Sequence, residues 1–297
     1  MADGTLAAIH LHPIKSCGRV EVLSAIVAGH GLQGDRSWQV IDADAKPITQ
    51  RQHPILATVR PELLEPSSPN SGLRISADNR APIEVAPITP DTPTIIAKTL
   101  FGVAIDAGDA GDEAADWFSD LLGQPVRLVG ADPSRWRPLP ERFDVFDQPV
   151  SFADAGPVLV ATTASLDWLV ERSSEPFTMP RFRPNLVVDT SRPWVEDTWH
   201  EFTIGDAALV QGLPWPRCAI PQIDQDTGAR FSEPAKVLRR YRWCTSAPTV
   251  REAMRPIVEG NGLFGLACSI GAPGTVLTVG DELTVVSTRE PVLAPPA

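Results

Sequence analysis

The sequence lacks three features that would assign it to a class at once: an excess of positive charge, a long apolar run and a paired-cysteine motif. Asp and Glu (37) outnumber Lys and Arg (26), so the formal net charge is −11 and a phosphate backbone would be repelled. No run approaches the roughly 18 apolar residues of a membrane-spanning helix. Residues 1–15 also lack the basic start and apolar block of a secretory signal. We therefore expect a cytoplasmic protein that binds neither nucleic acid nor membrane.

Cysteines are few and dispersed, at positions 17, 218, 244 and 268. None forms C-x-x-C, their spacing fits no zinc ribbon, and a disulfide framework is not expected in a chain of this length without an export signal. Cys268 lies in an apolar run and is predicted to be buried, as is favoured for Cys244, whereas Cys17 fits either environment. Cys218 differs because Pro216 and Arg217 precede it in a polar, turn-rich stretch.

What the sequence does contain is proline, 30 residues spread along the chain, which favours many short elements over long helices. Strands are predicted at residues 6–14, 20–28, 37–42 and 55–64, and again towards the C-terminus. Gly205–Asp206 and Gly280–Asp281 predict tight hairpin turns. Helices are predicted at 112–122, 163–173 and 232–243. The predicted fold class is mainly β with α, a β-barrel-rich α+β fold.

Two segments near the N-terminus place a cation in a turn, which is a pattern suited to anion binding. Lys15 and Ser16 end a strand, where an ammonium, a hydroxyl and free backbone N–H groups can hold an anion. A solvated lysine in an ordinary loop is the favoured local alternative. Arg36, in "GLQGDRSW", can fork onto a phosphate or can pair with Asp35 and pin the turn, and the two interpretations are equally weighted.

Two further arginines lie in comparable positions. Arg51 belongs to the polar turn "ITQRQHP", where a solvated arginine is the favoured interpretation. Arg183 and Asn185, in "RFRPNLVVD", surround a proline and could form a rigid donor array for an oxygen-rich ligand. A strand-entry turn capped by Asn185 is the slightly favoured alternative.

Cys218 is the strongest candidate for chemistry, because the adjacent Arg217 favours a thiolate. A peptidase role would need a histidine base, and none of the five histidines lies in a recognisable cysteine-protease context. A ligand for a soft metal is the other use of a lone thiolate. His10 and His12 are two residues apart on a strand and could supply half of a metal site, although a solvent-facing pair is favoured.

Seven motifs occur in one order along nearly the whole chain. They are "HPIKSC", "GDRSW", "TQRQHP", "FRPNLVVD", "EDTWHEFTIGDAAL", "PRCAIPQIDQDTGARFSEPAKVLRRYR" and a closing "FG…PGTVLTVGDELTVV". Together they resemble the MOSC family, in which an N-terminal MOSC β-barrel domain precedes the MOSC domain, and its amidoxime-reducing branch with bacterial relatives. The resemblance implies a two-lobed MOSC architecture. It divides the chain into residues 1–130, 131–288 and a tail at 289–297, with the Pro- and Arg-rich stretch 131–149 at the boundary.

The resemblance implies a mononuclear molybdenum cofactor (Mo-molybdopterin), held between the lobes by a pterin dithiolene and by one cysteine, here Cys218. Pro216 and Arg217 would flank the anionic cofactor, and Asp154 could handle protons near the metal. The other residues carried over as cofactor-binding are Lys15, Ser16, Arg36, Arg51, Ala155, Gly156, Arg183 and Asn185. The chain departs from the animal enzymes, which have threonine and serine at the positions of Ala155 and Gly156 and a tyrosine at that of Ala267.

The implied function is reduction of N-hydroxylated or N-oxygenated small molecules. Its electrons would come from a separate ferredoxin-, flavin- or cytochrome b5-type protein. The same cysteine would also serve a carrier of the molybdenum cofactor or a sulfur-transfer protein that uses a persulfide. A non-enzymatic β-barrel that binds another phosphorylated ligand is the third alternative.

Overall fold

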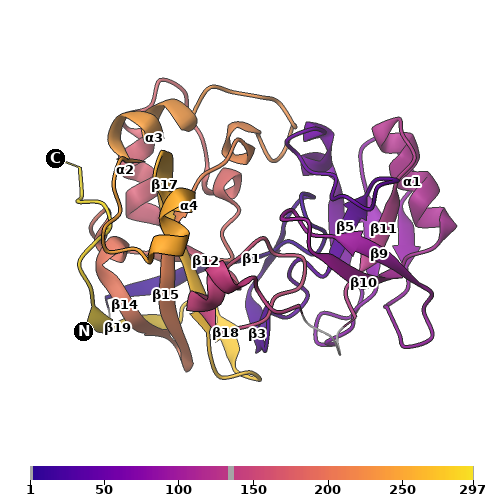
Figure 1. Ribbon diagram of the computed structural model, residues 1–297, viewed down its shortest axis with the longest axis horizontal. Coiled ribbons are helices and arrows are strands. Elements are labelled where there is room, and N and C mark those ends of the chain that lie inside the picture. Colours follow the sequence, from indigo (N-terminus) through magenta and orange to yellow (C-terminus); the bar gives the residue numbers. More distant parts are fainter. Residues whose placement is uncertain (1–2, 133–136, 297) are drawn as a thin grey trace.

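Strands from both ends of the chain meet in the larger lobe of the computed structural model, which describes residues 3–132 and 137–296 (Figure 1). Seven strands pair in a closed ring, because β12 pairs with both β13 and β17. In ring order they are β12 (Val158–Thr162), β13 (Leu186–Asp189), β1 (Gly4–Leu11), β19 (Glu282–Thr288), β14 (Trp199–Ile204), β15 (Ala207–Pro216) and β17 (Asn261–Ile270). The predicted mainly β, barrel-rich fold is therefore confirmed.

Apolar side chains alternate along these strands and fill the barrel. Leu6, Val160, Leu186 and Phe202 are among its fully buried residues. Strands β2 (Val20–Val22) and β16 (Trp243–Cys244) extend the sheet beside β1 and β17. A small sheet of β18 (Val276–Thr278), β3 (Ser24–Ala28) and β4 (Gly31–Leu32) lies beside the barrel.

The smaller lobe has its own sheets and its own apolar core. One sheet contains β5 (Trp38–Ile41), β11 (Arg127–Gly130), β10 (Ala104–Asp109) and β9 (Thr94–Lys98), and the other contains β6 (Arg60–Leu63), β7 (Leu73–Ser76) and β8 (Ile83–Val85). Helix α1 (Asp112–Leu122) packs its predicted stripe onto them, with Trp117 and Phe118 buried, and Gly123 ends it in the left-handed conformation.

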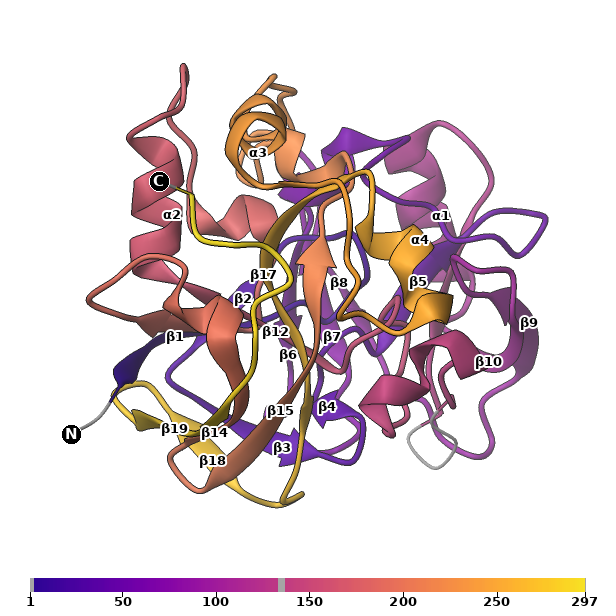
Figure 2. The same cartoon turned by 60° about the vertical axis from the view of Figure 1, so that its left-hand side comes forward.

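The remaining helices belong to the barrel lobe. They are α2 (Thr163–Val170), α3 (Ala235–Tyr241) and α4 (Arg255–Val258). Short 3-10 segments lie at η1 (Pro54–Thr58), η2 (Glu141–Phe146), η3 (Met179–Phe182), η4 (Val195–Thr198), η5 (Ile220–Gln222) and η6 (Glu252–Met254). Figure 2 shows α2 and α3 together at one end of the barrel. Within the described residues, no helix is long and apolar enough to span a membrane.

Several local predictions need correction. The turn at Gly280–Asp281 exists, but β18 pairs with β3 and β19 with β1 and β14, so the flanking strands form no hairpin. By contrast, Ile204 pairs with Ala207 across Gly205–Asp206, which confirms the other hairpin. The predicted strand at 55–64 begins as η1, and only β6 is extended. The predicted strand at 20–28 is broken at Leu23, and residues 12–14 lie outside β1.

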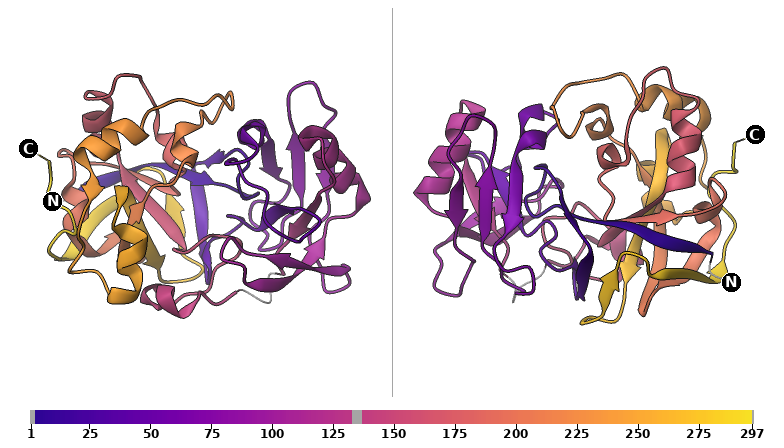
Figure 3. Two further views of the ribbon diagram at one scale, coloured as in Figure 1. Left: turned by 45° about the horizontal axis from the view of Figure 1, so that its top comes forward. Right: turned by 180° about the vertical axis from the view of Figure 1, so that it is seen from behind.

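Strand β1 places N-terminal sequence inside the barrel lobe, and Figure 3 shows both chain ends on that lobe. Directly after β1 the chain crosses to the smaller lobe, where Ile14 bridges Trp38 of β5. The predicted domain boundary at residue 130 therefore stays a proposal. Residues 4–11 precede that boundary in the sequence, but they complete a barrel whose other strands all lie beyond residue 157. Residues 133–136 of the predicted boundary lie outside the described residues.

Candidate functional site

A cavity of about 100 Å³ opens where segments from both lobes meet. Five cationic side chains line it: Lys15, Arg36, Arg51, Arg183 and Arg217. Asp154 is the one carboxylate among the described lining residues, and Cys218 is also at the wall. Eight of the predicted site residues are therefore brought together: Lys15, Ser16, Arg36, Arg51, Asp154, Arg183, Arg217 and Cys218.

The turn that follows β1 fixes Lys15 and Ser16. Its backbone is tied to the smaller lobe because the Lys15 N–H donates to the Trp38 carbonyl at 2.8 Å. The Lys15 Nζ donates to the Phe152 carbonyl at 2.8 Å and forms an ion pair with Asp154. Both lysine and serine are buried. The favoured local alternative, a solvated lysine, is wrong because the ammonium is buried and enclosed by the 152–154 loop.

Arg36 takes both roles that the sequence left open. It forms an ion pair with Asp35 and also lines the cavity. Its Nη1 donates to Asn185 Oδ1 at 3.0 Å, and its Nη2 donates to the Arg183 carbonyl at 3.2 Å. Asn185 therefore orients the Arg36 guanidinium through a hydrogen bond and does not itself line the cavity. It also accepts from the Leu159 N–H at 3.1 Å, which fixes the entry to β12.

Three of the lining residues adopt backbone conformations that are unusual for residues with side chains. Ser16, Arg36 and Arg183 have φ of 66°, 49° and 53°. Such left-handed residues cost energy and persist where the surrounding structure enforces them, which is common at ligand sites. Their clustering around one cavity supports a binding role for it.

Cys218 lies just after β15, in the segment that leads to η5, and it is exposed while Cys17, Cys244 and Cys268 are buried. Burial alone would lower the pKa of Arg51, but contact with Cys218 and the charge of Asp154 raise it. Arg51 is thus half-buried beside the thiol, and its predicted solvation is wrong.

The neighbouring Arg217 is held by a backbone carbonyl. Its Nη2 donates to the Phe182 carbonyl at 2.6 Å, while its Nε and Nη1 are buried and have no hydrogen-bond partner among the residues that the structure describes. Such unpaired buried donors are costly and mark a position where a ligand acceptor is expected.

The cavity wall carries more positive than negative charge, with five cationic side chains and one carboxylate among the described lining residues. Burial, aided by repulsion from Arg36, lowers the pKa of Arg183 to about 9. Burial likewise lowers the pKa of Arg217 to about 10, and it lowers the pKa of Lys15 from its ordinary value. An anion in the cavity would offset these desolvation penalties. The arrangement can therefore seat a phosphate-bearing ligand and present one thiol, that of Cys218, to a metal.

Besides Asn185, three predicted residues do not line the cavity. Ala155 is buried in an apolar cluster, and a Cβ on Gly156 would meet Ala267 Cβ at 2.7 Å. Pro216 ends β15 and lies opposite Leu263 of β17. A direct role for these residues in binding stays a prediction.

The histidine pair also differs from the favoured interpretation. His10 and His12 are buried, so the solvent-facing pair is wrong, and burial is the first cause that lowers the pKa of each. His12 lies near Asp35, with Nδ1 3.7 Å from Oδ1. Over the described ranges no group of three or more His, Cys, Asp or Glu residues could hold a metal ion.

Sequence reasoning missed several lining residues, among them Thr49, Phe182 and Trp215. Phe182 directly precedes Arg183, and Trp215 directly precedes Pro216. Their place in "RFRPN" and "PWPRC", next to predicted site residues, was the signal that could have found them. Thr49 begins the "TQRQHP" motif, and its Oγ1 accepts from the Arg51 N–H at 3.3 Å, which fixes that turn.

Comparison with known proteins shows the family of this chain. Residues 3–125 match the MOSC N-terminal beta barrel domain, and residues 147–284 match the MOSC domain. Mitochondrial amidoxime reducing component 2 of Rattus norvegicus is 34% identical over 94% of this chain and 82% of its own length. Mitochondrial amidoxime-reducing component 1 is 33% identical in Mus musculus and 31% identical in Homo sapiens, with the same two coverages.

Proposed function

Because this chain belongs to the MOSC family, in the branch of the amidoxime reducing components, we propose that it is a molybdenum-cofactor-dependent reductase of N-hydroxylated small molecules. The relatives' names supply the reaction class, reduction of amidoximes. Two electrons and two protons convert an N-hydroxyl group into N–H and water. A separate electron-transfer protein of the ferredoxin, flavin or cytochrome b5 type would supply the electrons.

The single observation that carries the proposal is the meeting of five cations and one exposed thiol at one inter-lobe cavity. The chain as a whole has a net charge of −11, so this local excess of positive charge is not a consequence of composition. Guanidinium and ammonium groups pair well with phosphate oxygens. A thiolate beside them is a ligand suited to a soft metal.

The residues present fit the molybdenum cofactor. Lys15, Arg36 and Arg183 would hold its phosphate, and the two unpaired nitrogens of Arg217 would find acceptors. Cys218 would ligate the metal, next to Arg51, which is in contact with it. When bound, the cofactor supplies the two-electron redox chemistry, and the protein's part is binding, orientation and electrostatics.

Asp154 has a more limited task than a general acid. Burial alone would raise its pKa, but the charges of Lys15 and Arg51 lower it, so the carboxylate is ionised near neutral pH. We propose that it orients Lys15 and can accept a proton at the cavity wall. Its side chain is 31% exposed, which leaves it open to solvent on one side.

Replacing the thiol tests the proposal. The full chain is expressed in a host that makes the cofactor and is assayed with an aryl amidoxime and an artificial one-electron donor. Cys218→Ser should abolish reduction, while the control Cys244→Ser, at a buried thiol outside the cavity, should retain it. Full activity of Cys218→Ser would refute the assigned ligand. A metal-free protein that carries a persulfide on Cys218 would instead identify a sulfur-transfer protein.

The compartment also stays a proposal. The sequence predicts the cytoplasm, whereas the relatives bear mitochondrial names. Fractionation of the source cells with an antibody against this chain would decide between them.

A further inference from the structure

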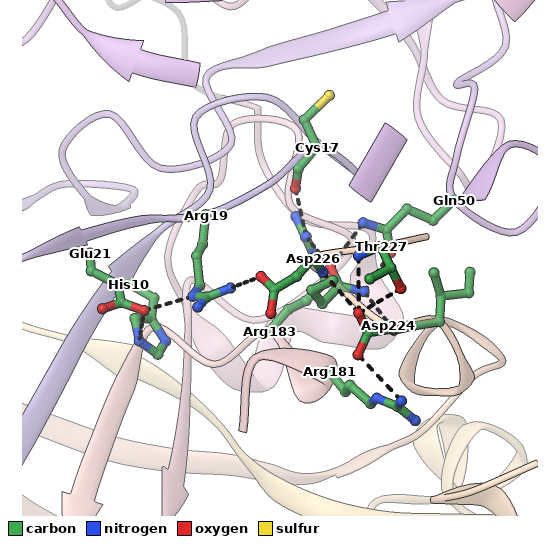
Figure 4. A network of polar contacts seen from close by, with 12 residues as sticks. His10, Cys17, Arg19, Glu21, Gln50, Arg181, Arg183, Asp224, Asp226 and Thr227 are labelled. Atoms are coloured by element: carbon green, nitrogen blue, oxygen red, sulfur yellow. Dashed lines mark hydrogen bonds and ion pairs between the residues drawn. The ribbon is translucent and has the colours of Figure 1, made fainter. Parts of the chain in front are cut away.

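Arg183 is held in place by uncharged groups. Its Nη1 donates to the Cys17 carbonyl at 2.6 Å and to Gln225 Oε1 at 3.0 Å. No ion pair to Arg183 is formed among the residues that the structure describes, although it is buried. Figure 4 shows Arg183 between Cys17 and the Asp224–Thr227 turn, with Gln50 close by.

The other charged groups around Arg183 do not neutralise it. Asp35 lies nearby but forms an ion pair with Arg36, and burial raises the pKa of the Cys17 thiol to about 12, so it stays uncharged. Arg36 and Arg19 add positive charge. Burying an unpaired cation is costly, and a carboxylate would be the ordinary way to offset that cost.

Gln225 occupies the position where such a carboxylate would fit. It is buried and forms a reciprocal amide pair with Gln50 of the smaller lobe, at 3.0 and 3.1 Å. Its Nε2 also donates to the Ile223 carbonyl at 3.0 Å. The amide therefore joins three parts of the site: the segment after Cys218, the turn that carries Arg51, and Arg183 itself.

We infer that Gln225 is a positioning residue that fixes the Arg183 guanidinium through a neutral acceptor, so that its full positive charge remains available to an anionic ligand in the cavity. The inference rests on the proposed function for the identity of that ligand, but its physical content concerns any phosphate-bearing anion. A glutamate of the same shape could accept the same hydrogen bond and would cancel the charge.

The test compares isosteric variants of the full chain without cofactor, with inorganic phosphate as the probe and calorimetric titration as the readout. Gln225→Glu should weaken phosphate binding about tenfold or more, since a carboxylate is added close to the anion seat. Its melting temperature should stay at or above that of Gln225→Ala, because the new charge pairs with Arg183. Gln50→Glu is the matched control: the charge change is the same, but Gln50 has no hydrogen bond to Arg183, so a smaller loss is expected.

Unchanged phosphate affinity of Gln225→Glu would overturn the inference, as would an equal or larger loss in Gln50→Glu. If Gln225→Glu does not fold, Gln225→Met removes the acceptor without adding charge. A loss of less than tenfold is then expected, because Arg183 keeps its charge. A loss of tenfold or more would overturn the inference, because the hydrogen bond and not the charge would then govern binding. Wild-type protein that binds no phosphate at millimolar concentration would count against the anion seat and the proposed function together.

Discussion

A serine at position 156 should destabilise this protein. A Cβ built on Gly156 would lie 2.7 Å from Ala267 Cβ and 3.2 Å from two ring atoms of Phe146. Ala267 and Phe146 are 3% and 1% exposed, so neither can move aside into solvent. Overpacking of this kind costs about 1–3 kcal/mol. We expect Gly156→Ser to lower the melting temperature by about 2–12 °C, since about 1 kcal/mol corresponds to about 2–4 °C in a protein of roughly 150–250 residues.

The clash with Ala267 can be separated from other effects of the serine. Removing the Ala267 methyl group should make Gly156→Ser less costly in the Ala267→Gly background than in the wild type, by about 0.5 kcal/mol or more in a double-mutant cycle. Gly29→Ser is the control, because a Cβ at Gly29 would meet nothing within 4 Å. Thermal unfolding of the four proteins and the control is the assay. A Gly156→Ser protein that melts within 1 °C of wild type, or a cycle without coupling, would refute the packing argument.

Two further predictions concern buried and exposed titratable groups. Burial and the charge of Asp197 raise the pKa of Glu196 from 4.5 to about 7. The folded state therefore keeps a proton that the unfolded chain releases, and Glu196 lowers stability progressively from about pH 4.5 to pH 7. Glu196→Gln should be more stable than wild type above pH 7, on the order of 3 kcal/mol, and should lose this advantage below pH 4.5. Melting curves of both proteins from pH 4 to pH 8 check it, and a pH-independent difference would contradict it. Separately, iodoacetamide should label native cofactor-free protein at Cys218 alone, since the other three cysteines are buried. Mass spectrometry that finds native Cys218→Ser labelled as fast as wild type would contradict this exposure pattern.

Local patterns predicted the elements whose partners are close in sequence. The stripe of Trp117 and Phe118 has helical spacing, and Gly205 can adopt the positive φ that a tight hairpin turn needs, here 51°. The pairing of β1 with β13 and β19 had no such signal, because it joins residues near 5 with residues near 188 and 283. The hairpin predicted at Gly280–Asp281 was wrong for the same reason. The turn itself is local, but the strands on either side of it pair with strands that are distant in the sequence.

The candidate site divides in a similar way. Lys15, Arg36 and Arg183 could be found because charged residues in turns are conspicuous, and the order of the motifs indicated that they belong together. Arg51 and the histidine pair were misjudged, because burial depends on the opposing lobe and leaves no trace in the local sequence. Gln225 could not be predicted from the sequence either, because a neutral amide in a polar turn is common. Only its contacts with Gln50 and Arg183 in the structure distinguish it.

The most direct measurement of the central claim is the molybdenum and pterin content of the full chain after expression in a cofactor-producing host, with wild type and Arg183→Met compared. The account predicts about one molybdenum and one pterin for each wild-type chain, and a clear loss of both when one cation of the cavity is removed. Wild-type protein that carries neither, under conditions in which another molybdoenzyme of the same host is loaded, would contradict it.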